Sequence, residues 1–428
     1  MTPVNHHLIS KKELLRPEFW IARLRQPDRI IMTAPQIHAY NQAVVQNLHD
    51  MVVELSDYPE TIDQTTLTAW ITKKNFPQTT VYCHGQPVTP TYYNALETKL
   101  NLNALQTANP VRYGFTVKRA NLRTFPTDDL ILEDSARPEF DLFQETALNP
   151  AEALLILHQS ATGDWYFVQT ANYRGWLAAG DLGITDRVTW QNYRAQPDFL
   201  IVTGSHLKVT VPTGAGELTE VFFEMGAKIP LAEATPKNGR DYLVRLPVLE
   251  SKDRLVFKTV TVPVTATVTL GYLPYTRANI LQQAFKMYGQ PYDWGGRNGS
   301  IDCSAFIMNI FHCFGFKLPR NSNVQAELPG KTINLASLSS GEKMKQLRSL
   351  QPGATLYLKG HVMLFLGLNN GCPLIIHALS SYGVPDSLGK IQKVYHLQVA
   401  VTDLFLLRAS GQSFFEALTT AKTIELEL

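Results

Sequence analysis

One apolar run, Ala305 to Phe316, constrains the fold of this 428-residue chain more than any other feature. Asp302, Cys303 and Ser304 stand directly before it. Asp is a good N-cap residue, and an apolar run of this length is typical of a buried helix. The sequence therefore predicts a buried helix with Cys303 in its first turn.

A thiol in the first turn of a helix is favoured as the thiolate. Unpaired backbone N–H groups and the positive end of the helix dipole lie there, and they lower a free-cysteine pKa of about 8.5 by about one to several units. The Asp302 carboxylate opposes this shift. We therefore expect a cationic residue close to Cys303.

Two short apolar runs further on, residues 361–368 and 373–379, predict the two strands of a β-hairpin. The loop between them decides where His361 and His377 point. A three-residue loop that ends at Gly371 places both imidazoles on one face as diagonal neighbours, whereas a two-residue turn places them on opposite faces. We expect the three-residue loop.

Cys303, His361 and His377 together match the minimal set for thiol catalysis. Cys303 would be the nucleophile, His361 the base, and His377 the residue that orients the base. An isolated cysteine or histidine in such positions is more often a core residue or a satisfied strand residue. The catalytic interpretation therefore depends on the surrounding sequence.

Four segments supply that context: Gly289 to Gly296 (GQPYDWGG), Asp302 to Phe306 (DCSAF), Gly360 to Gly367 (GHVMLFLG) and Ile376 to Ala378 (IHA). Together they resemble the NlpC/P60 family of papain-like cell-wall cysteine peptidases. Ala305 stands where the family pattern usually has glycine.

The stretches Val117 to Arg123, Gly163 to Tyr166 and Tyr173 to Trp176 resemble the bacterial SH3-like domains that accompany this peptidase family. Short alternating strands with turns also favour small β-barrels. We expect an α+β multidomain protein with four parts. These are a mainly helical N-terminal segment (1–110), two SH3-like β-barrels (111–198 and 199–270), and a papain-like NlpC/P60 catalytic domain (271–428).

The family resemblance implies a cysteine peptidase that cleaves peptidoglycan stem peptides. The bond would be the amide between γ-D-glutamate and a diamino acid, meso-diaminopimelate or lysine, and the reaction would pass through an acyl-enzyme. The backbone N–H of Cys303 would help to hold the oxyanion. No cofactor is expected.

The resemblance also implies how substrates are selected. In relatives of this architecture the first SH3-like domain narrows the cleft, so that only peptides with a free N-terminal L-alanine fit. Asp302 is suited to receive that ammonium through a charge-assisted hydrogen bond. We expect Ser304, Tyr292 and Tyr173 to contact substrate as well, although a tyrosine in a barrel is more often a core residue.

Composition excludes several other functions. The net charge is only +2, from 39 basic and 37 acidic residues, and the basic residues form no stripe, so nucleic acid is not an expected partner. No stretch of 18 apolar residues predicts a membrane span. A metal site is not expected, because Cys83-His84 has no further ligands at the usual spacing. We expect a monomer whose partners are stem peptides and muropeptides.

Two questions stay open at this point. Met1 to Arg16 lacks the apolar core of a signal peptide. The chain as written would therefore be cytoplasmic and recycle muropeptides, or periplasmic or secreted if a signal has been removed. The alternatives for function are a cell-wall-binding module with a degenerate peptidase domain, and a thiol amidase or acyltransferase that acts on another substrate.

Overall fold

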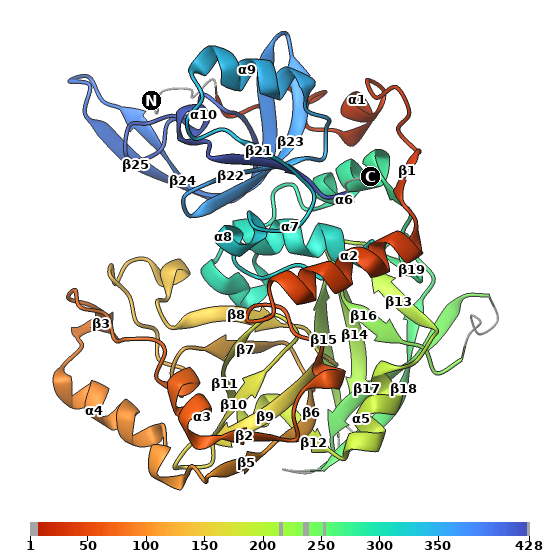
Figure 1. Ribbon diagram of the computed structural model, residues 1–428, viewed down its shortest axis with the longest axis vertical. Helices are drawn as coiled ribbons and strands as arrows, with labels where there is room; N and C mark the ends of the chain where they lie inside the picture. The colour runs from red at the N-terminus through yellow and green to blue at the C-terminus, as the bar shows by residue number, and fades with distance from the viewer. Residues whose placement is uncertain (1–6, 214–216, 234–238, 251–253, 426–428) are drawn as a thin grey trace.

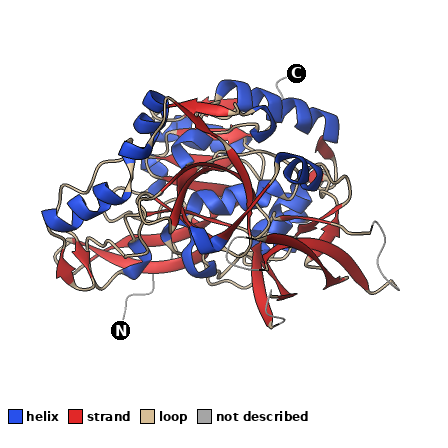
Figure 2. Cartoon of the chain, turned by 90° about the horizontal axis from the view of Figure 1, so that it is seen from below, coloured by secondary structure: helices blue, strands red, loops and turns tan. Residues whose placement is uncertain are grey.

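The computed structural model describes residues 7–213, 217–233, 239–250 and 254–425. It is a mixed α/β protein with an upper lobe built from the C-terminal part of the chain and a broad β-rich lower part (Figure 1). Seen from below, strands form a curled sheet at the centre of the molecule, and helices lie around it (Figure 2). None of the helices among these residues is long and apolar enough to cross a membrane.

The upper lobe is a six-stranded antiparallel sheet with the strand order β21-β26-β22-β23-β24-β25. Its strands are β21 (Lys331–Asn334), β22 (Thr355–Leu358), β23 (His361–Asn369), β24 (Cys372–Pro385), β25 (Ile391–Asp403) and β26 (Thr420–Thr423). The helices of this lobe are α6 (Arg277–Lys286), η5 (Trp294–Gly299), α7 (Cys303–His312), α8 (Ser322–Gln325), α9 (Ser340–Ser349) and α10 (Phe414–Ala417). Helix α7 packs on β23 and β24, as expected for a buried helix.

The hairpin of β23 and β24 places His361 and His377 on one face, as predicted, but the loop that was expected to produce this register is not present. Its turn has two residues, because Leu368 pairs with Pro373 and Asn369 with Cys372, so the expected three-residue loop is wrong. A β-bulge at Leu366 supplies the extra residue instead. Beyond the bulge Leu364 pairs with Ile376. Continuing that pairing by one residue places His377 opposite Met363, on the face of His361.

The first β-rich unit is one seven-stranded sheet with the strand order β12-β6-β9-β10-β11-β7-β8. The strands are β6 (Arg112–Thr116), β7 (Ala120–Arg123), β8 (Gln144–Leu148), β9 (Ala153–Gln159), β10 (Trp165–Gln169), β11 (Arg174–Ala178) and β12 (Leu182–Thr185), with short helices η3 (Pro138–Phe140) and η4 (Ala179–Asp181). Helix α5 (Arg187–Arg194) follows it. The strands predicted in this part of the sequence are confirmed.

The second β-rich unit has its own apolar core, which includes Leu200, Val209, Phe223 and Val262. It is built from β13 (Phe199–Val202), β14 (His206–Pro212), β15 (Leu218–Glu224), β16 (Lys228–Pro230), β17 (Asp241–Leu249), β18 (Leu255–Pro263) and β19 (Val268–Leu270). Gly226 lies against α7, where an added Cβ would be 2.7 Å from the backbone oxygen of Asn309. This contact requires glycine and brings the unit close to the helix of Cys303.

The N-terminal segment joins the upper lobe to the first β-rich unit (Figure 1). Its helices are α1 (Pro17–Ile21), α2 (Ala34–Asn47), η1 (Leu55–Asp57), α3 (Gln64–Ile71), α4 (Pro90–Lys99) and η2 (Leu102–Ala104), and its strands are β1 (Ile30–Met32), β2 (Thr61–Asp63), β3 (Tyr82–Cys83), β4 (Gln86–Pro87) and β5 (Ala108–Pro110). Strand β1 pairs with β20 (Tyr275–Thr276) of the upper lobe. The Tyr40 hydroxyl donates to the Pro329 carbonyl 2.9 Å away.

Candidate active site

Cys303 is the first residue of α7, and the predicted N-cap is confirmed. The Asp302 carboxylate accepts a hydrogen bond from the backbone N–H of Ala305 at 2.9 Å. Cys303 is only 8% exposed, and the helix that it begins packs on β23. The start of the helix therefore places the thiol against the start of β23.

The cation expected near Cys303 is Arg320, which follows α7 in the sequence. Its guanidinium donates to both oxygens of Asp302, at 3.0 and 2.5 Å. It also donates to the hydroxyl of Ser304 at 2.8 Å and to that of Thr146, on β8 of the first β-rich unit, at 2.8 Å. A single buried arginine thus connects the N-terminus of α7 to the neighbouring unit.

The carboxylate of Asp302 is fully occupied by these contacts. Its Oδ1 accepts from Ala305, Ser304 and Arg320, and its Oδ2 accepts from Gly295 and Arg320. Burial opposes the ionisation of Asp302, but the Arg320 charge and these hydrogen bonds hold its pKa below the ordinary value. That Asp302 receives a substrate ammonium stays a prediction, and its contacts count against it.

His361 and His377 are direct hydrogen-bond partners. His361 is the first residue of β23, and its Nε2 is 2.7 Å from Nδ1 of His377 on β24. The other nitrogen of His377, Nε2, is 3.2 Å from the Thr402 hydroxyl on β25. Three adjacent strands therefore supply a chain of polar groups that fixes the orientation of the His361 ring.

Burial keeps the thiol and the imidazoles neutral in this state. Desolvation, followed by the charge of Asp302, raises the pKa of Cys303 to about 12, despite the opposing effects of Val362 and Arg320. Desolvation and then Arg408 lower the pKa of His361 to about 3. The expectation of a lowered thiol pKa is therefore wrong here, because burial outweighs the helix terminus.

Tyr292 and Ser304 lie beside Cys303, as expected of site residues. The Tyr292 side chain is buried, and its pKa is raised by desolvation and then by the nearby Cys303 and Asp302. The Ser304 hydroxyl donates to Asp302 at 3.2 Å. Ser304 is thus part of the polar network that holds Arg320.

Tyr173 lies near Arg320, in the first β-rich unit. Its hydroxyl donates to the carboxylate of Glu145, and desolvation and then Glu145 raise its pKa. Glu145 also accepts from the Thr124 hydroxyl at 2.6 Å and lies 3.1 Å from the ammonium of Lys74. These groups, together with Arg320, line a cavity of about 200 Å³ that the N-terminal segment borders.

The sequence indicated neither Arg320 nor Glu145 as a site residue. The signal for Arg320 was indirect, since the Asp302 carboxylate next to the thiol required a cation. Glu145 lies 158 residues before Cys303 in the chain, and it comes near Arg320 because β8 packs against η5 and because Thr146 on β8 bonds to Arg320. In that contact the Trp294 indole donates to the Gln144 carbonyl at 3.1 Å.

Comparisons with known proteins agree with this architecture. Residues 289–401 match the NlpC/P60 family model, and residues 134–178 match the SH3 domain model of SH3b1 type. A probable endopeptidase of Mycobacterium tuberculosis is 33% identical over 122 residues, which cover 27% of this chain and 28% of that protein. A gamma-D-glutamyl-L-lysine dipeptidyl-peptidase of Bacillus subtilis is 37% identical over 68 residues, which cover 16% of this chain and 23% of that protein.

The chain thus spans about a quarter of the length of the curated relatives that it matches. Among solved structures, an NlpC/P60 endopeptidase from Photobacterium damselae subsp. piscicida is similar with a TM-score of 0.73. Its sequence identity is 16%, and the match covers 97% of this chain and 95% of that one. The chain therefore contains a papain-like NlpC/P60 domain and an SH3b domain, and it shares its overall fold with that structure.

The buried neutral His361 makes stability depend on pH. The unfolded chain takes up a proton at a histidine pKa of about 6.5, whereas the folded pKa is about 3, so the free energy of unfolding falls as the pH falls below about 6.5. Between pH 6.5 and 5 this contribution is about 1.5 kcal/mol. In urea denaturation, we expect the free energy of unfolding to fall less for His361→Gln than for the parent over this pH range. An equal loss would contradict the neutral, buried imidazole.

Proposed function

We propose that this protein is a cysteine endopeptidase that hydrolyses the amide between γ-D-glutamate and a diamino acid in peptidoglycan stem peptides. The main support is the placement of Cys303 at the start of α7, against the strand that begins with His361, whose ring is hydrogen-bonded to His377. The name of the similar Bacillus subtilis protein indicates the same type of bond. The diamino acid is meso-diaminopimelate or lysine.

The geometry supports acyl transfer with His361 as the base. Its Nε2 is used by His377, so Nδ1 would accept the thiol proton as the Cys303 sulfur bonds to the γ-carbonyl carbon. The imidazolium then gives this proton to the amine of the departing diamino acid as the C–N bond breaks. A water molecule next attacks the thioester, passes a proton to His361, and releases the carboxylate and the thiol.

The backbone N–H of Cys303 is suited to the oxyanion. It belongs to the first turn of α7, where helix N–H groups lack intrahelical partners and the dipole is positive. Because thiol and imidazole start as a neutral pair, the proton moves during attack. Stabilisation of the developing negative charge is therefore more important here than a preformed thiolate.

We propose Glu145, with Tyr173, as the group that receives the free N-terminal ammonium of the substrate. Glu145 and Arg320 line the same cavity, and the Glu145 side chain is 11% exposed. The Lys74 ammonium, 3.1 Å away, already forms the kind of charge-assisted contact that a substrate amine would make. Binding of the substrate would displace Lys74, whose side chain is 56% exposed.

The proposed domain organisation favours a small substrate. We propose that 1–110 is an accessory segment, 111–198 and 199–270 are two SH3-like domains, and 271–428 is the catalytic domain. The first SH3-like domain and the accessory segment border the cavity beside Arg320. Short free muropeptides fit such a site better than the glycan-linked stems of an intact cell wall.

Replacement of the nucleophile tests the reaction. Cys303→Ala should lower the hydrolysis of L-Ala-γ-D-Glu-meso-diaminopimelate at least about a thousandfold, because no other group would form the acyl-enzyme. The release of L-Ala-γ-D-Glu is measured by chromatography with mass detection. Cys372→Ser is the control, since it removes a half-buried thiol at the start of β24, five residues before His377, and it should retain the parent rate. Undiminished hydrolysis by Cys303→Ala would exclude the proposal.

Selection for a free amine is tested with a pair of peptides. The parent should hydrolyse the free tripeptide at least about a hundredfold better, in kcat/KM, than its N-acetyl form, because the cap removes the charge that pairs with Glu145. Glu145→Gln should reduce this ratio at least about tenfold.

Glu220→Gln is the matched control for that experiment, because it breaks an exposed ion pair with Lys208 in the second β-rich unit. It should keep the ratio of the parent. Lys74→Met should raise this ratio, because loss of the competing ammonium lowers the KM for the free peptide. Equal turnover of the two peptides by the parent protein would exclude a gate for the free amine.

A further inference from the structure

A second group of reactive side chains lies apart from Cys303, where the β3–β4 hairpin meets the first β-rich unit. Tyr82 and Leu132 exchange backbone hydrogen bonds of 2.8 and 3.0 Å, which attach the hairpin to the loop that contains Asp129. The hairpin turn is formed by His84 and Gly85, with φ of 50° and 76°. His84 thus has a left-handed backbone, which is uncommon for a residue other than glycine.

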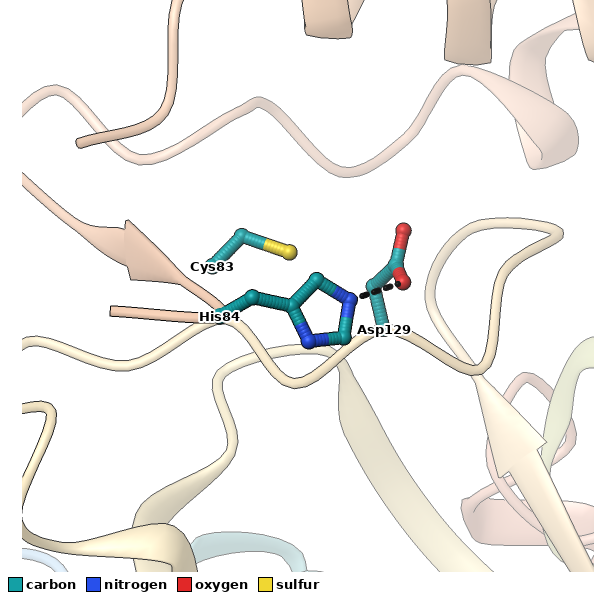
Figure 3. A group of neighbouring side chains, drawn as sticks. All are labelled: Cys83, His84 and Asp129. Atoms are coloured by element: carbon teal, nitrogen blue, oxygen red, sulfur yellow. Dashed lines mark hydrogen bonds and ion pairs between the residues drawn. The ribbon is translucent and has the colours of Figure 1, made fainter. Parts of the chain in front are cut away.

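Cys83, His84 and Asp129 point toward one another across this contact (Figure 3). Their ligand atoms all lie within 4.8 Å of each other, and Nε2 of His84 is 3.1 Å from Oδ1 of Asp129. The expectation that Cys83-His84 lacks further ligands is therefore wrong. The third ligand comes from a segment 45 residues away, which spacing along the sequence does not reveal.

The carboxylate of Asp129 is held in place by neighbouring side chains. Its Oδ2 accepts hydrogen bonds from the Tyr92 hydroxyl at 2.8 Å and from the Thr127 hydroxyl at 3.0 Å. These contacts leave Oδ1 directed at His84. Hydrogen bonds of this kind orient carboxylate ligands in metal sites and are part of what makes such sites selective.

We propose that Cys83, His84 and Asp129 form a binding site for a zinc ion. A thiolate, an imidazole and a carboxylate are the ligands that Zn²⁺ prefers. A tetrahedral ion with bonds of about 2.0–2.3 Å needs ligand atoms about 3.3–3.7 Å apart. Nε2 of His84 and Oδ1 of Asp129 are 3.1 Å apart, slightly closer than this range, and the Cys83 sulfur lies within 4.8 Å of both, so small rotations of all three side chains would bring them to bonding distance of one ion. The fourth ligand is water, since His84 faces solvent.

Such an ion would link the N-terminal segment to the first β-rich unit. The two parts already share one apolar cluster, which includes Leu67 and Leu96 from the segment and Phe125 and Trp176 from the unit. An ion bound to both parts would stabilise the folded state further, according to its affinity and concentration. Binding would displace the thiol proton of Cys83 to solvent, because the ligand is the thiolate.

Cobalt binding tests this site. The full chain with Cys303→Ala is freed of metal with a chelator and titrated with Co²⁺, so that the other thiol close to two histidines is absent. We expect one equivalent to bind with a sulfur-to-cobalt charge-transfer band, which Zn²⁺ then removes. We also expect Zn²⁺ to raise the Tm by several degrees.

Variants assign the ligands. Cys83→Ser should abolish the charge-transfer band, and His84→Gln and Asp129→Asn should each weaken cobalt binding at least tenfold. Cys372→Ser is the control, because Cys372 is also a half-buried thiol that lies beside a carboxylate, Asp403. It should keep the band. Melting curves of the metal-free variants check that each one is folded.

Three results would overturn the proposal. These are the absence of bound cobalt in the parent, a band that survives Cys83→Ser, and a band that disappears with Cys372→Ser instead. Each of them would leave His84 and Asp129 as a surface ion pair next to an unreactive thiol.

Discussion

The buried ion pair of Asp302 and Arg320 is the interaction on which the arrangement of the site depends. It holds the residue that caps α7, and thereby the position of Cys303, and it extends to Thr146 in the first β-rich unit. Removal of one partner of a buried pair costs about 3–5 kcal/mol, because the other charge stays buried and unpaired. Cys303 and the adjoining unit are therefore positioned together.

Burial has a second consequence for the proposed chemistry. The environment that fixes the site also disfavours charge on the Cys303 thiol and on His361, so the two residues are neutral in the absence of substrate. A neutral pair gains its charges only when an electrophile is in place. Such a site would favour a bound acyl substrate over a small reagent from solution.

Local patterns in the sequence were sufficient for much of the fold and for part of the site. The start of α7 at Cys303 and the strands of the first β-rich unit were predictable, because capping and alternation are local properties. The shared face of His361 and His377 was predicted as well, but through a loop that does not exist. The signal for the bulge was Gly367, because a glycine inside a strand pattern often marks a bulge, but glycine alone does not fix which residue is the extra one.

Contacts between segments that are far apart in the sequence could not be predicted from local patterns. Glu145 and Asp129 are ordinary surface-type residues in the sequence, and each becomes notable only when another part of the chain packs against it. The same holds for Asp302, which looked free to bind an ammonium until Arg320 was placed beside it. Which charged residues pair with each other depends on tertiary packing, and a single sequence does not show this packing.

We propose that Asp302 binds and orients Arg320, while Glu145 recognises the free amine of the substrate. The most direct test is the double variant Asp302→Asn, Arg320→Met, which removes both buried charges and keeps an N-cap residue. The measurement is the ratio of kcat/KM for the free and the N-acetylated tripeptide. We predict that the ratio stays within about threefold of the parent value even if both rates fall, since Glu145 is unchanged. A ratio close to one in the folded double variant would contradict the claim.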